Sequence, residues 1–193
     1  MSVDGMGAND VGRIGSLLGV TDGPKWRCEY LVEKVWKAPD AQHDAGDREY
    51  IHGVGNLLLN GGADVIWKRL ITLNPTTAAG AVLSAFSTLS KIGVGASTAT
   101  STASQTGLQH SSNKTYSGME SSYPAHTTGT STAARTAQFR AVFSTAQANY
   151  AWNEWTIQNS TAATFRALNR KVQSLGTKTS AAQWTFTATL TLS

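Results

Sequence analysis

Alternating hydrophobic and polar positions predict β-strands along most of the chain. In Trp184–Leu192, aromatic and aliphatic residues occupy every second position and threonines fill the positions between them. Nine residues with this period are typical of a strand that has one face in the core. Further strands are expected at Trp26–Trp36, Glu49–His52, Lys91–Gly95, Gln138–Ser144, Asn149–Gln158 and Thr164–Gln173. Short strands separated by turns predict a mainly β fold, an antiparallel β-sandwich or jelly roll.

One stretch has a helical period instead. Hydrophobic residues within Asn56–Leu73 follow an approximate helical stripe, and Asn56 is a candidate N-cap. Gly61 and Gly62 weaken the middle of this stripe by roughly 1 kcal/mol each relative to alanine. We therefore expect a helix near 56–73, with room for a kink, and either a second short helix or a loop at Ala78–Leu89.

The first 23 residues predict a flexible N-terminal arm. This segment holds six glycines and one short apolar patch, formed by Ile14, Leu17 and Leu18. Such a segment buries too little apolar surface to offset the entropy of ordering it. It either becomes ordered against a partner or stays a floppy terminus. We expect an arm over residues 1–23 and a single β-sandwich-type domain over residues 24–193.

Charge is unevenly distributed along the 193 residues, whose formal net charge is +4. Residues 76–193 hold eight lysines and arginines but only two acidic residues, Glu120 and Glu154. The basic residues are scattered and form no run, so a solvated face or contacts to neighbouring subunits are favoured over nucleic-acid binding. No apolar run approaches 18 residues, and the N-terminal sequence does not have the pattern of a secretory signal.

Motifs for catalysis or metal binding are weak. Cys28 is the single cysteine and falls on the apolar face of a predicted strand, which favours a buried structural thiol over a nucleophile. No serine lies in a Gly-x-Ser-x-Gly turn, and the acidic loop around Asp40 and Asp47 matches no calcium-binding spacing. We therefore assign no catalytic residue, no cofactor and no metal, and expect a non-enzymatic protein.

Candidate interaction residues come from three features. Trp152 and Trp155 are three positions apart, so either a bulge separates them or one is in the core and the other faces outward. Core or subunit-interface packing is favoured, although an exposed tryptophan would mark a surface for sugar or nucleic acid. The candidate interaction surface combines the apolar arm, these tryptophans and a basic set: Ile14, Leu17, Leu18, Trp152, Trp155, Arg166, Arg170 and Lys171.

The order of motifs over roughly residues 26–193 resembles a recurrent protein of tailed bacteriophages. The motifs are WRCEYLVEKVW, GNLLLNGGADVIWKRL, IGVG with a Ser/Thr-rich loop, TGLQ…NKTY…YP, FRAVF, AWNEW, LNRKV and the alternating threonine-rich end. Their order is specific, whereas no single motif is. The last motifs are also similar to the sandwich modules of tail-collar and tail-fibre proteins. The chain departs from the pattern at Gly61-Gly62, where relatives tend to carry a helix former.

This resemblance implies a structural role in the virion, assembled in the host cytoplasm. The first expectation is a capsid decoration, or cement, protein that docks on the shell. The alternatives are a tail or neck component, such as a fibre adaptor or collar protein, and a receptor- or carbohydrate-binding module. The expected partners are major capsid or tail proteins and further copies of the chain in a homo-oligomer. Neither a membrane nor nucleic acid is expected as a partner.

Overall fold

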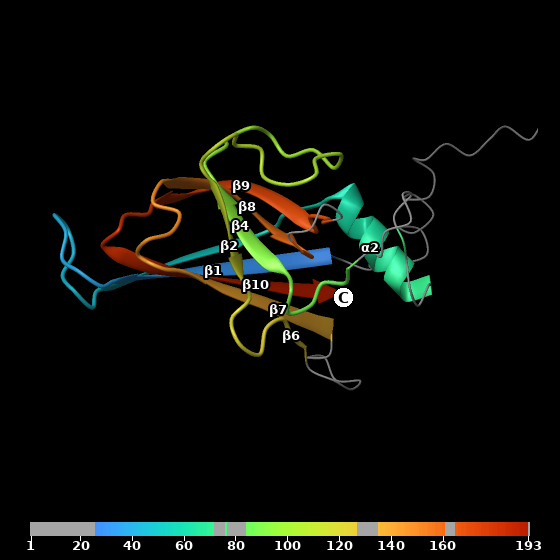
Figure 1. Ribbon diagram of the computed structural model, residues 1–193, viewed down its shortest axis with the longest axis horizontal. Coiled ribbons are helices and arrows are strands. Elements are labelled where there is room, and N and C mark those ends of the chain that lie inside the picture. The colour runs from blue at the N-terminus through green and yellow to red at the C-terminus, as the bar shows by residue number, and fades with distance from the viewer. Residues whose placement is uncertain (1–25, 72–75, 77–83, 127–134, 161–164, 193) are drawn as a thin grey trace, which may run out of the picture.

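Two antiparallel sheets pack face to face and form a β-sandwich with a helix at one end (Figure 1). The computed structural model describes residues 26–71, 76, 84–126, 135–160 and 165–192. Each sheet has five strands, and the described residues contain one helix. The predicted mainly β fold with an antiparallel sandwich is therefore confirmed.

The first sheet is built around the two strands with the clearest alternation. Its order is β2-β1-β10-β7-β6. Strands β1 and β10 pair over their whole length, from Trp26 opposite Leu192 to Trp36 opposite Ala182. The strands are β1 (Trp26–Trp36), β2 (Arg48–Val54), β6 (Ala125–His126), β7 (Thr136–Phe143) and β10 (Ala182–Leu192).

The second sheet has the order β3-β9-β8-β4-β5. It comprises β3 (Leu57–Leu58), β4 (Lys91–Gly95), β5 (Lys114–Gly118), β8 (Ala151–Gln158) and β9 (Asn169–Thr177). The sequence predicts no strand at β5 or β6, which lie in the Ser/Thr-rich part of the chain. Both are polar and lack the alternation that would have marked them.

Aromatic side chains from both sheets form the core. Trp155 packs against Tyr30 and Phe186 of the first sheet, with ring centroids 5.3 and 4.9 Å apart. Trp152 meets Trp184 edge to face at 4.6 Å. Pairs of this kind add about 0.5–1.5 kcal/mol beyond the area that they bury. They hold the sheets in one relative position.

The helix α2 (Asn60–Ile71) lies at the end of the sandwich where β1 begins and β10 ends (Figure 1). It starts later than predicted because Leu57 and Leu58 pair with β9 as strand β3. Asn56 is therefore not its N-cap, and the Asn56 side-chain oxygen instead accepts a hydrogen bond from the Trp26 indole at 2.9 Å.

Several other predictions concern segment boundaries. The strand expected at Thr164–Gln173 begins at Asn169, and residues 161–164 lie outside the described part. Of the segment 78–89, the described residues 84–89 contain no helix. The predicted arm over residues 1–23 also lies outside the described residues.

Candidate functional site

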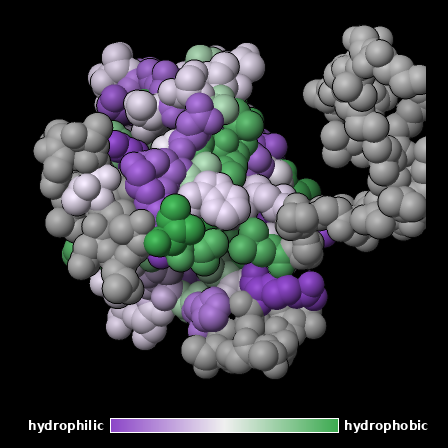
Figure 2. All heavy atoms as spheres, turned by 90° about the vertical axis from the view of Figure 1, so that its right-hand side faces the viewer, coloured by the Kyte–Doolittle hydropathy of each residue, from purple (hydrophilic) through white to green (hydrophobic). Residues whose placement is uncertain are grey.

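The end of the molecule that carries α2 exposes a cluster of large apolar side chains. Ile66, Trp67, Leu70 and Ile71 are 37%, 62%, 72% and 77% exposed. They share one side of the helix, while Gly62 and Val65 are buried on the other side. Figure 2 faces this end and shows hydrophobic side chains gathered across its middle. Large exposed apolar patches of this kind mark interaction sites.

A groove continues this surface between α2 and the first sheet. It has a volume of about 220 Å³ and is lined mainly by hydrophobic side chains. Ile66 and Leu192 line the groove and are themselves exposed, so the groove and the outer side of α2 form one surface. We call this surface the apolar end. The other apolar groove residues are Trp26, Phe86, Ala137, Phe139, Leu168 and Leu190, accompanied by His126, Arg135 and Thr136.

Sequence reasoning did not select the residues of the apolar end. Ile66 and Leu70 lie on the hydrophobic stripe of the predicted helix, and such a stripe normally faces the core. The sequence contained one indication of this surface, which is the length of the predicted helix. The end of a sandwich can cover only part of a long helix, so the rest of the apolar stripe is exposed. The predicted contact residues Ile14, Leu17 and Leu18 lie outside the described residues.

The two candidate tryptophans are buried. Trp152 and Trp155 are both 0% exposed, which confirms the favoured packing in the core, whereas their inclusion in the candidate interaction surface is wrong. The register of β8 against β9 shifts between Trp152 and Glu154, which is the bulge that the sequence left as one alternative. Because of this bulge, both indoles point into the core despite their spacing.

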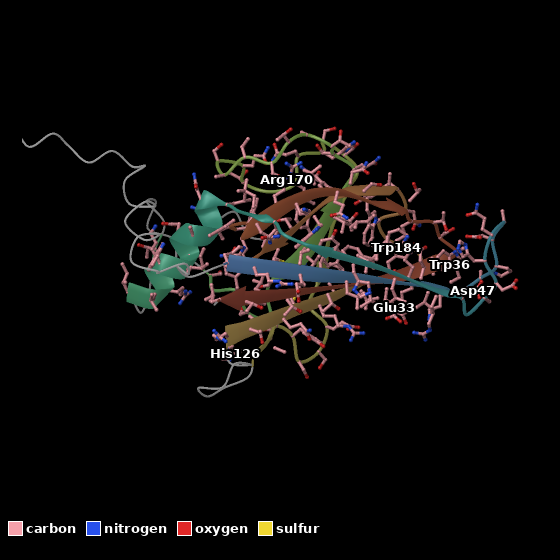
Figure 3. All side chains as sticks on the ribbon, turned by 180° about the vertical axis from the view of Figure 1, so that it is seen from behind. Glu33, Trp36, Asp47, His126, Arg170 and Trp184 are labelled. Atoms are coloured by element: carbon pink, nitrogen blue, oxygen red, sulfur yellow. The ribbon has the colours of Figure 1, made fainter. Side chains whose placement is uncertain are left out.

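Arg170 is also buried, in an ion pair with Glu154. Arg170 Nε donates to Glu154 Oε2 at 2.7 Å, and both side chains are 0% exposed. The backbone N–H groups of Gln109 and His110 donate to the same carboxylate at 2.9 and 3.0 Å. Arg170 Nη1 donates to the carbonyl of Ala99 at 2.9 Å. Figure 3 shows Arg170 beneath the loop between β4 and β5, which this cluster fastens to the second sheet.

This cluster has a structural role. Removing one partner of a buried ion pair typically destabilises a protein by about 3–5 kcal/mol. The prediction that Arg170 contributes to an interaction surface is therefore wrong, because its guanidinium is committed to Glu154 and to the loop.

Arg166 and Lys171 are half-buried and lie on two sides of that loop. Lys171 lines an open hollow of about 510 Å³ with Thr98 and Thr100, and Arg166 lines another of about 560 Å³ with Thr106. Arg166, Arg170 and Lys171 therefore lie in one region of the molecule. They do not form one surface, because Arg170 is buried in its ion pair and the other two residues line separate hollows.

The opposite end of the sandwich is closed by polar contacts. Trp36 stacks on His43 with ring centroids 3.6 Å apart, and its indole donates to Asp40 at 2.8 Å. The N–H of Gln42 also donates to Asp40, which holds the pKa of that carboxyl at about 2. Figure 3 places Trp36 and Asp47 together at this end.

Cys28 is fully buried, as expected, and burial raises the pKa of its thiol to about 12. Among the described residues, no group of three or more histidine, cysteine, aspartate or glutamate side chains is placed to hold a metal ion. In the same part of the chain, no helix is both long and apolar enough to cross a membrane.

Comparison with protein families, with curated proteins and with solved structures finds no match to this chain. A functional assignment therefore depends on the residues themselves, on the motif order and on the geometry of the apolar end.

Proposed function

We propose that this protein is a non-enzymatic structural protein of a tailed-phage particle, which decorates the capsid shell in many copies. The apolar end is the observation that carries this proposal. A helix that presents Trp67, Leu70 and Ile71 to water is unfavourable in an isolated molecule, since large exposed apolar patches promote association. In an assembly the same surface is a contact between subunits.

The order of the sequence motifs supports a tailed-phage particle as the assembly. It resembles tailed-bacteriophage virion proteins over roughly residues 26–193, and it ends in the alternating strand that is now seen as β10. The resemblance brings no catalytic residues with it.

The body of the molecule suits a repeated structural subunit. Its two sheets are joined by an aromatic core, and its longest described loop is fastened to the second sheet through Glu154 and Arg170. A body held in this way presents the apolar end in one fixed geometry, so identical copies can repeat the same contact.

The number of copies per purified particle tests this proposal. Quantitative mass spectrometry would measure the chain against the major capsid protein of the same particles. We expect a ratio of one copy per capsid subunit or per few subunits, because a decoration protein covers the shell. A few copies per particle would overturn decoration in favour of a tail or neck component. Absence from particles would overturn the virion assignment itself.

A further inference from the structure

The apolar end has two parts that a single partner must cover. The groove is a concave site of about 220 Å³, which can take a few apolar side chains. The outer side of α2 is convex, and Trp67, Leu70 and Ile71 stand out from it. A partner therefore needs a short apolar segment for the groove and a second apolar surface for the helix.

We infer that the partner is a second copy of this chain. Residues Ile14–Leu18 of one copy enter the groove of the other, and the α2 helices of the two copies pack against each other. The inference rests on the assembly role proposed for the apolar end, although it does not depend on which particle the protein joins.

The N-terminal segment has the composition that the groove requires. Ile14, Leu17 and Leu18 are spaced i, i+3 and i+4, which is the spacing of the apolar anchors in segments that bind hydrophobic grooves. From Val11 to Val20, Arg13 is the only charged residue. Short apolar segments with this spacing bind in hydrophobic grooves.

The place where this segment joins the body also fits. Trp26, the first described residue, lines the groove, so the preceding chain begins at the apolar end. Leu18 lies eight positions before Trp26, and an extended chain of eight such steps spans at most about 26–29 Å. The segment can therefore reach the same end of an adjoining molecule.

A second copy covers more of this surface than the molecule's own segment would. Three apolar side chains can fill the groove, but they leave the outer side of α2 in water. A second copy supplies its own α2 for that side, and a two-fold arrangement repeats both contacts. This arrangement buries Trp67 twice, and buried tryptophans are among the side chains that dominate interface energies.

Disulfide trapping between differently labelled copies tests the inference. Cys28 is the single native cysteine and is 0% exposed, so the introduced cysteines are the accessible thiols. The full-length L17C variant would be mixed with full-length L192C, since Leu192 lines the groove and is 56% exposed. The Y50C variant is the matched control, because Tyr50 is 51% exposed on β2 and does not line the groove.

We expect the L17C–L192C pair to cross-link about tenfold or more faster than the L17C–Y50C pair, because a bound segment has a high effective concentration at the groove. Sedimentation of the wild-type chain should show a concentration-dependent dimer, which L70S abolishes and Y50S does not. Equal cross-linking rates would overturn the inference. So would a monomer whose L17C/L192C double variant cross-links within one chain.

These outcomes are separable from the proposed function. A monomer that is abundant on particles would overturn the paired copies and leave the decoration role. A dimer that is absent from particles would overturn the decoration role and leave the pairing.

Discussion

Because α2 packs against the second sheet, we expect alanine to have different effects on stability at two neighbouring glycines. A methyl group added at Gly62 would lie 2.6 Å from the Cα of Leu168, and closer still to its carbonyl oxygen. A methyl group at Gly61 would first meet the Cδ of Arg166, at 3.1 Å, which belongs to a flexible side chain and not to the backbone. The helix therefore touches the backbone before β9 at Gly62 but not at Gly61.

The magnitudes follow from two opposing effects. Replacing a helical glycine with alanine gains up to about 1 kcal/mol from conformational preference at either position. At Gly62, α2 would have to move by about 0.8 Å for the Leu168 Cα to reach the ordinary contact distance of 3.4 Å. Overpacking of this kind costs about 1–3 kcal/mol. We expect G62A to lose up to about 2 kcal/mol of unfolding free energy and G61A to lose none.

Urea unfolding followed by tryptophan fluorescence would measure both variants against the wild type. G61A is the matched control, because it makes the same chemical change one residue earlier in the same helix turn. If G62A is as stable as G61A, α2 does not rest on the Leu168 backbone, and the close packing described above is wrong. A fall for both variants alike would show that both glycines are required by the helix start.

Two further predictions concern buried titratable groups. Burial lowers the pKa of Lys178 to about 8 from 10.5. Between these two pH values the unfolded chain therefore binds a proton at Lys178 that the folded chain does not bind. The contribution of this group to stability consequently rises with pH over that range. The stability difference between wild type and K178M, measured by unfolding at a series of pH values, should shift toward the wild type from pH 8 to 10.5; parallel curves would contradict this. The Asn149 partner of Lys178 is exposed and can bond to water in the variant. Cys28 should react with a thiol reagent only as fast as the protein unfolds, since its buried thiol has a pKa of about 12; rapid labelling of native protein would refute its burial.

The two longest strands were predicted from a pattern that a single buried face of the sheet dictates. Trp26–Trp36 and Trp184–Leu192 alternate because one side of each packs on the aromatic core. The helix start was predicted wrongly because local capping chemistry favoured Asn56, whereas a tertiary pairing with β9 takes Leu57 and Leu58 into the sheet. Such a pairing depends on a partner more than 100 residues away in the chain, which local pattern does not contain.

The site residues failed for related reasons. Arg170 was chosen for its charge, but its role is fixed by Glu154 on the neighbouring strand and by the carbonyl of Ala99 in the loop above. Trp152 and Trp155 could not be assigned to a face, because one extra residue in a bulge reverses the parity of everything beyond it. In both cases a contact between distant segments decided whether a side chain was buried.

The two ends of the sandwich differ in a way that gives the molecule a direction. At the end away from α2, Lys34 lies 4.5 Å from the centre of the Trp184 ring and pairs with Glu49 at 3.1 Å. Lys34 and Glu49 therefore place polar groups over the aromatic core there, and the charge of Lys34 is paired within the chain. At the α2 end, Trp67 and Leu70 remain exposed to water, so the exposed apolar surface of the described residues is concentrated at that end. Association through that pole alone closes after two copies and leaves the polar ends outward, whereas contacts at both ends would extend into a chain.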